Sequence, residues 1–245
     1  MDGGDLPAVK LDKFKDPLVK FEKQFPFHRM HIASFRQVIY NFGKDKFAIS
    51  DLKARLPGSL WEQALKPGSP TMTLLESLPG SEKNDSDPLE TLVDTTSMLL
   101  LSIIWCGGDF DDKAEALFQC LNPPGQSQEG ISANDKEWDL VFDTMCYLAT
   151  VFTVDQAMQQ GINTKSYDED LTKRGIKGMR ISEIEDPPAH MGFIMQVFGY
   201  ESRLDRDAFF ATVIDKNCNW VFQANKIRER LVPFLDEGVL DEVEA

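Results

Sequence analysis

Short stretches with apolar residues at helical spacing, separated by breaks that contain Gly or Pro, follow one another along most of this chain. Phe35, Val38, Ile39 and Phe42 lie on one face of such a stretch, and Gly43 ends it. The order of helix, loop and helix recurs about four times, at intervals of roughly 40 to 60 residues. Beyond pairs of residues in the loops, no stretch alternates as a strand does. We therefore predict an all-α fold of helix-loop-helix pairs with short β-bridges between loops.

The middle of the chain contains a break at Gly107 and Gly108, which we interpret as the hinge between two halves. Asp109 is placed to cap the helix that follows, and Ser34 and Ser50 are candidate N-caps in the first half. The predicted parts are an N-terminal arm at 1–24, a lobe at 25–106, a second lobe at 109–234 with a polar excursion at 159–188, and an acidic tail at 235–245.

The chain is strongly acidic, and this charge limits its partners. Its 245 residues carry 40 acidic and 26 basic side chains, a formal net charge of −14. Nucleic-acid backbones and anionic membrane surfaces are repelled by such a chain, so we expect a protein partner with a basic or amphipathic helix and no nucleic acid.

Targeting and membrane signals are missing from the sequence. The first residues, MDGGDLPAVK, lack the apolar core of a secretory signal, and the longest apolar run, Met98 to Trp105, is too short to cross a bilayer. The cysteines have no CxxC spacing, which favours reduced thiols over a disulfide frame or a zinc site: Cys106, Cys120, Cys146 and Cys218. We predict a cytoplasmic protein without membrane insertion.

The stretch LNPPGQSQEGIS, residues 121–132, has the length of a cation-binding loop and contains Pro and Gly residues that interrupt helices. Calcium loops place oxygen donors at fixed positions, with an aliphatic residue at position 8 and a bidentate Glu at position 12. With Ile131 as the aliphatic residue, Ser132 stands at position 9 and Asp135 at position 12, but the loop back to Asn122 is two residues too long. It offers about one carboxylate, so we expect very weak calcium binding.

The other candidate loops have also lost their ligands. Anchoring on Val93 places Asp94 at position 9 but Ser97 at position 12, and anchoring on Leu204 places Ala208 at position 12. Around Ile49 the break is too short for a ligand set. The expected cofactor is none, with calcium unlikely. The alternative is one atypical site formed by four carboxylates, which would make the protein a calcium-responsive sensor subunit: Asp85, Asp87, Glu90 and Asp94.

The order of these pieces resembles a known family. The run MLLLSIIWCGGDFDDKAEALFQCLN and the later GISANDKEWDLVFDTM resemble the middle of the neuronal calcium sensor and calcineurin B-like branch of the EF-hand superfamily. HMGFIMQVFGYESRLDRDAFFATVIDKN resembles the fourth hand of that branch. The resemblance implies a two-lobed arrangement of EF-hand-like pairs with degenerate calcium loops. Ciliary and cytoskeletal EF-hand proteins share this layout, so a cytoskeletal or ciliary location is compatible with the resemblance.

Signs of catalysis are absent from the sequence. His28 and His31 stand three residues apart without a third metal ligand in sight, and we interpret them as surface or packing residues. The sequence contains neither a G-x-S-x-G motif nor a Gly-rich phosphate loop. We therefore predict that the protein is not an enzyme.

Methionine and aromatic side chains in the two central helices are candidates for a partner-binding groove. Ordinary core filling is the alternative for each of them. The candidates are Met98, Leu101, Trp105, Phe142 and Met145. The leading hypothesis is a non-catalytic adaptor or structural protein, a subunit of a larger assembly, whose groove is permanently occupied by a partner's helix or by its own arm.

Overall fold

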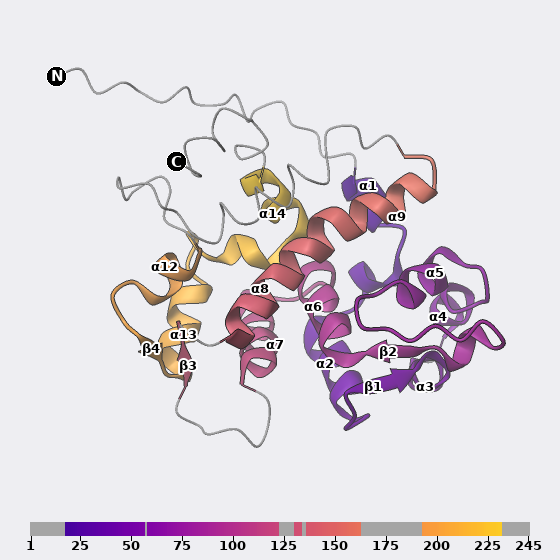
Figure 1. Cartoon of the computed structure of the whole chain (residues 1–245), viewed down its shortest axis with the longest axis horizontal. Helices are drawn as coiled ribbons and strands as arrows, with labels where there is room; N and C mark the ends of the chain where they lie inside the picture. The colour runs from indigo at the N-terminus through magenta and orange to yellow at the C-terminus, as the bar shows by residue number, and fades with distance from the viewer. Residues whose placement is uncertain (1–17, 57, 123–129, 134–135, 163–192, 232–245) are drawn as a thin grey trace.

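The computed structural model describes residues 18–56, 58–122, 130–133, 136–162 and 193–231 (Figure 1). Within these ranges the chain is mostly helical, with two small antiparallel sheets. The predicted all-α class is therefore confirmed for the described residues. The polar excursion beyond residue 162 and the acidic tail lie outside the described residues, as does Asp135.

The first half runs from α1 to α6. Its elements are α1 (Leu18–Glu22), η2 (Pro26–Arg29), α2 (Ile32–Tyr40), β1 (Lys46–Ala48), α3 (Ile49–Arg55), α4 (Ser59–Ala64), α5 (Pro70–Glu76), η3 (Pro88–Glu90), β2 (Leu92–Asp94) and α6 (Thr95–Trp105).

The second half begins after Gly107 and Gly108. Its described elements are α7 (Phe110–Leu121), β3 (Ile131–Ser132), α8 (Lys136–Tyr147), the π-helical turn η4 (Leu148–Phe152), α9 (Thr153–Gln159), α12 (Phe193–Phe198), β4 (Arg203–Leu204), α13 (Arg206–Val213), η5 (Asn219–Phe222) and α14 (Ala224–Leu231). In Figure 1, α8, η4 and α9 form one long helical rod that crosses the molecule diagonally.

Two short sheets join loops in pairs. β1 and β2 pair antiparallel with Phe47 opposite Val93, and β3 and β4 pair antiparallel with Ile131 opposite Leu204. Val93, Ile131 and Leu204, the aliphatic residues chosen to align the candidate loops, therefore all lie in these strand pairs. In the first sheet the residue opposite Val93 is Phe47, and the backbone N–H of Ile49 donates to the carbonyl of Thr91 at 3.1 Å.

Both halves contribute to one continuous hydrophobic core, which contains side chains from Leu18 to Ile227. The break at Gly107 is held by backbone pairing: its N–H donates to the carbonyl of Met30 at 2.9 Å, and its own carbonyl accepts from Ile32 at 2.8 Å. Two backbone hydrogen bonds therefore tie the predicted hinge to the start of α2.

Part of the predicted N-terminal arm belongs to the core. Leu18 and Phe21 of α1 are fully buried, and α1 contacts α9 (Figure 1). Their spacing of three residues places both side chains on the same face of a helical turn. The described part of residues 1–24 is therefore an integral element of the fold rather than an arm.

The predicted helix caps meet different outcomes. Asp109 accepts a hydrogen bond from the N–H of Asp112 at 3.0 Å, which confirms the predicted N-cap. Ser34 and Ser50 are not caps, because α2 starts at Ile32 and α3 at Ile49, where the backbone N–H groups already donate to carbonyls across the fold. Among the described helices, none has the length and apolar character needed to cross a membrane.

Candidate functional site

The five predicted partner-binding side chains lie in the core. Met98, Leu101 and Trp105 on α6 and Phe142 and Met145 on α8 are each no more than 2% exposed. Every side chain of α6 from Ser97 to Trp105 is buried, because this helix is covered on all sides. In this conformation all five side chains therefore fill the core, and Trp105 also borders the pocket described below.

The chain's own N-terminal segment covers Trp105. The ring of Phe25 lies 5.1 Å from the indole, the ring of Phe27 lies 5.9 Å away, and the imidazole of His28 stacks on it at 6.4 Å with an interplanar angle of 20°. Offset and edge-on aromatic contacts of this kind add stability beyond their buried area. These three residues belong to the predicted lobe at 25–106 rather than to the predicted arm at 1–24.

The four carboxylates of the alternative calcium site have other roles. Asp94 caps α6 by accepting from Ser97 N at 2.7 Å, and Asp87 caps η3 by accepting from Leu89 N at 3.0 Å. Asp85 lies 3.4 Å from the ammonium of Lys83, and Glu90 is exposed. Over the described ranges, no group of three or more His, Cys, Asp and Glu side chains is arranged to hold a metal ion.

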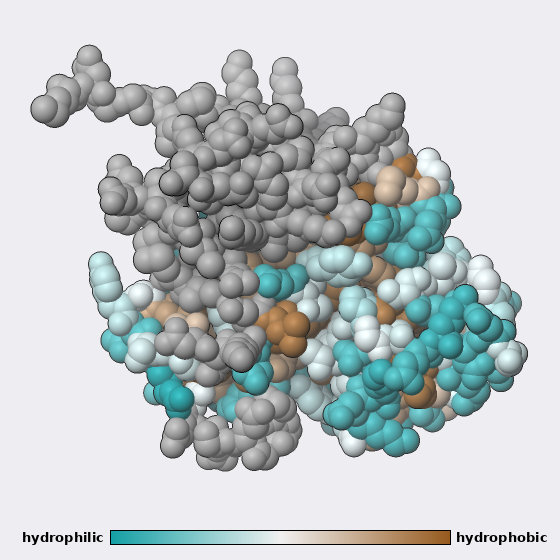
Figure 2. All heavy atoms as spheres, in the orientation of Figure 1, coloured by the Kyte–Doolittle hydropathy of each residue, from teal (hydrophilic) through white to brown (hydrophobic). Residues whose placement is uncertain are grey.

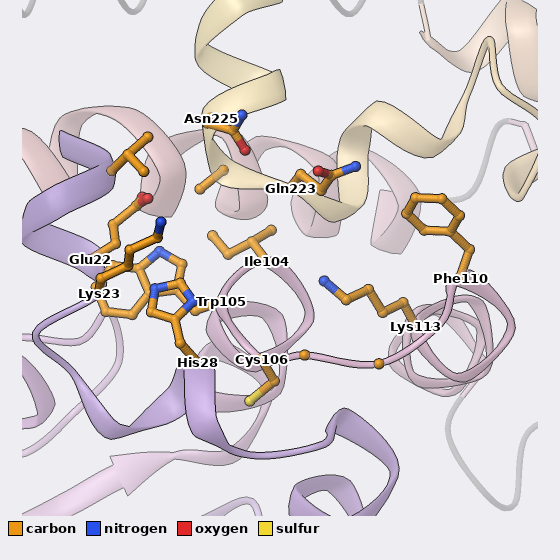
Figure 3. Close-up of a pocket in the computed structure, with 14 residues that line it drawn as sticks. Glu22, Lys23, His28, Ile104, Trp105, Cys106, Phe110, Lys113, Gln223 and Asn225 are labelled. Carbon is orange, nitrogen blue, oxygen red and sulfur yellow. The ribbon is translucent and has the colours of Figure 1, made fainter. Parts of the chain in front are cut away.

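A polar pocket lies where the first half, the glycine linker and the last helix meet (Figure 3). Its volume is about 360 Å³. The segment between α1 and η2 forms one wall, the end of α6 and the start of α7 form the floor, and the turn before α14 closes the far side. We call it the junction pocket. Its polar lining consists of Glu22, Lys23, His28, Trp105, Cys106, Lys113, Gln223 and Asn225.

Lys113 is the buried charge of this pocket. Lys113 is 5% exposed, and its Nζ donates to the carbonyl of Phe222 at 2.8 Å. Burial lowers the pKa of Lys113 to about 8, because removing an ammonium from water penalises its charged form. In the described part of the chain, no carboxylate forms an ion pair with it.

Two ring nitrogens at the pocket lack hydrogen-bond partners among the described residues: Nε2 of His28 and Nε1 of Trp105. His28 bonds to the backbone of Glu22, and since Nε2 is without a partner, this bond uses Nδ1. Burial lowers the pKa of His28, and the bond to Glu22 opposes that shift. The imidazole is therefore held neutral, with Nε2 as an acceptor.

The cysteines are thiols without nucleophilic character. Cys106 borders the pocket, and burial raises its pKa to about 12; burial likewise raises the pKa of Cys120 to about 12 and that of Cys218 to about 11. A nucleophilic or metal-binding cysteine needs the thiolate, which these environments disfavour. All four cysteines are free thiols, as predicted.

A buried ion pair engages Glu22, one of the residues that line the pocket. Nη1 of Arg228 donates to Oε1 of Glu22 at 2.8 Å and to the carbonyl of Ala149 at 2.6 Å. The carboxylate of Glu22 is thereby engaged by an arginine rather than by Lys113. Sequence reasoning missed both Arg228 and Lys113. The only signal was a Lys among apolar residues of the helix 110–121, and helical spacing alone does not show which cations become buried.

Comparisons with known proteins give one distant similarity. The chain is similar to Basic helix-loop-helix protein 80 of Oryza sativa subsp. indica and of subsp. japonica, at 30% identity over 142 residues in each case. The match covers 57% of this chain and 42% of each rice protein, so the chain spans less than half the length of these relatives. No family model matches the chain. No solved structure matches it.

Proposed function

We propose that this protein is a non-catalytic, EF-hand-like docking protein that works without calcium. One observation carries the proposal: loops are joined two by two through β1–β2 and β3–β4, while the carboxylates in and beside them serve as helix caps. Asp205 is a third example, accepting from Ala208 N at 2.8 Å at the start of α13. Each of these caps uses one oxygen of its carboxylate, and over the described residues no group of three or more such side chains is arranged as a calcium ligand set.

The proposed mechanism is constitutive. In a regulated calcium sensor, the ion changes the angle between paired helices and exposes an apolar groove. Here the helix pairs pack around a shared core, and Phe25, Phe27 and His28 lie against Trp105. We infer that the protein keeps one shape and presents a permanent surface to its partner, with the N-terminal segment in the place that a regulated protein reserves for a target helix.

Calorimetric titration of the full chain with calcium, after dialysis against EGTA, tests this proposal. We expect no saturable heat, and we expect that a partner co-purified with the intact protein stays bound in EGTA. A micromolar calcium site would overturn the proposal in favour of the calcium-responsive alternative. That alternative also predicts a calcium-dependent change in tryptophan fluorescence that is lost in Asp94→Ala and kept in the matched variant Asp51→Ala.

The proposed place of the protein is as a subunit of a larger assembly, in the cytoplasm and on cytoskeletal or ciliary structures. Identification of what co-purifies with the intact chain tests this. The similarity to a basic helix-loop-helix protein does not support a DNA-binding proposal, because such regions approach phosphates with clustered Lys and Arg, and this chain carries a net charge of −14.

A further inference from the structure

The docking proposal makes no use of the junction pocket, yet the described residues provide no counter-charge for the ammonium of Lys113 in this pocket. Buried lysines in folded proteins are nearly always paired with a carboxylate, because an isolated ammonium pays a large desolvation penalty. Lys113 is 95% removed from solvent, and among the described residues its ammonium donates to a single carbonyl, that of Phe222. An ammonium has three donors, so two remain for another group.

The groups that face Lys113 provide no negative charge. The thiol of Cys106 stays protonated in the physiological range, because burial raises its pKa to about 12. The imidazole of His28 is held neutral by burial. Lys23 adds a second cation to the lining, and Glu22 is engaged by Arg228 at 2.8 Å. In Figure 3 the ammonium of Lys113 extends from α7 into the pocket, toward the side chain of Ile104.

The pocket also contains unused hydrogen-bonding groups. Nε1 of Trp105 is a donor and Nε2 of His28 an acceptor, and neither has a partner among the described residues. Gln223 and Asn225 add two amide side chains on the opposite wall (Figure 3). A buried indole N–H without an acceptor is costly, and a ligand oxygen relieves that cost.

We propose that the junction pocket binds a small oxyanion, a carboxylate or a phosphate group, which supplies the counter-charge of Lys113. The volume of about 360 Å³ accommodates such a group together with a short organic body. The unpartnered acceptor on His28 favours an anion with its own hydroxyl or N–H donor. This inference stands apart from the docking proposal, and neither depends on the other.

A second depression, lined by three cations and one carboxylate, borders Gln223 as well. It has a volume of about 310 Å³ and shares Gln223 with the junction pocket. Lys216, Lys226 and Arg230 line it together with Glu229, which pairs with Lys226 at 2.7 Å. Its lining also includes Trp220, whose Nε1 is buried without a partner among the described residues. Local positive potential of this kind concentrates anions even where the whole molecule is negative.

The test uses the full chain labelled with ¹³C and ¹⁵N at the ends of its lysine side chains, followed by NMR. Inorganic phosphate and succinate are the two probes, and Lys113→Met identifies the Lys113 resonance. We expect one of the probes to shift this resonance saturably at pH 7 and to raise the pKa of Lys113 from about 8 toward its ordinary value. The affinity should fall more than about tenfold between pH 7 and pH 9.5, as the ammonium loses its proton.

The two probes distinguish a phosphate ligand from a carboxylate ligand. A response to phosphate alone assigns a phosphate ligand, and a response to succinate alone assigns a carboxylate. The matched variant Lys216→Met, which removes one cation from the neighbouring depression, should keep the saturable response. The proposal is overturned if neither probe changes the titration of Lys113. It is equally overturned if Lys113→Met, shown to be folded by its circular dichroism, binds the probe as tightly as the unmodified chain.

Discussion

Nη1 of Arg228 donates to Oε1 of Glu22 at 2.8 Å, across 206 positions of the chain, and both side chains are buried. The same Nη1 donates to the carbonyl of Ala149 at 2.6 Å, inside the π-helical turn η4. A π-helical turn leaves backbone carbonyls outside the regular helical pattern, and it often marks a functional position. Arg228 thus joins α1, the long central rod and α14, three elements that border or support the junction pocket.

Breaking this pair should be costly. Glu22→Ala leaves a buried guanidinium without its carboxylate, and we expect a loss of about 3–5 kcal/mol in the free energy of unfolding, measured in urea. Glu229→Ala is the control, because its pair with Lys226 is exposed and is worth about 1 kcal/mol or less. Equal losses in the two variants would show that the Glu22–Arg228 pair has no special role.

The N-terminal segment should be held mainly by its aromatic side chains. Phe27 is fully buried, with ring centroids 5.5 Å from Trp61 and 5.8 Å from Phe35. Phe27→Ala should lower the free energy of unfolding by about 3–5 kcal/mol, because it leaves a cavity in this cluster. Tyr200→Ala, at a fully exposed position, is the control and should change it by no more than about 0.5 kcal/mol. A comparably small loss for Phe27→Ala would mean that the segment is not an integral part of the core.

The sheet between β3 and β4 should depend on a glycine. Gly130 has a φ of +89°, and a Cβ added there would lie 2.2 Å from the carbonyl oxygen of Leu204. Gly199 also has a positive φ, +56°, but open space around it. Gly199→Ala should cost about 1–2 kcal/mol from backbone conformation alone. Gly130→Ala should cost clearly more and should broaden the NMR signals of Ile131 and Leu204; equal costs would contradict the close approach.

Lys113 should make stability depend on pH in the alkaline range. Its pKa falls from 10.5 in the unfolded chain to about 8 in the folded one. Between these values the unfolded state holds a proton that the folded state has released, so the free energy of unfolding rises with pH. Relative to Lys113→Met, the unmodified protein should gain about 2–3 kcal/mol between pH 8 and pH 10.5.

Urea unfolding of both chains at closely spaced pH values measures this gain. Lys66→Met, at an exposed position, is the control and should follow the unmodified protein at every pH. A constant difference between the unmodified protein and Lys113→Met across the same range would contradict the buried ammonium.

Asp94 should matter as a helix cap and not as a calcium ligand. Asp94→Ala removes the acceptor of the Ser97 N–H and should cost about 0.5–2 kcal/mol. The loss should be the same in EGTA and in calcium. Glu90→Ala, at an exposed position without a cap bond, is the matched control and should stay within about 0.5 kcal/mol. A loss seen only in calcium would revive the sensor alternative.

Local patterns were sufficient for the helical class, for the N-cap at Asp109 and for the paired residues Val93, Ile131 and Leu204. These features depend on neighbours a few positions away, such as a side chain that reaches the backbone three residues on, or an aliphatic residue at the end of a loop. They follow from backbone geometry and short-range hydrogen bonding, which a sequence carries directly.

Burial and long-range pairing were decided by the tertiary structure. Helix α6 is apolar on every face, so its sequence cannot tell a partner's groove from a core, and only the packing of residues 18–29 shows which one Trp105 faces. The isolation of Lys113 and the bond from Arg228 to Glu22 join elements far apart in the chain. Such contacts depend on how helices stack around a shared core, and periodicity contains no information on that stacking.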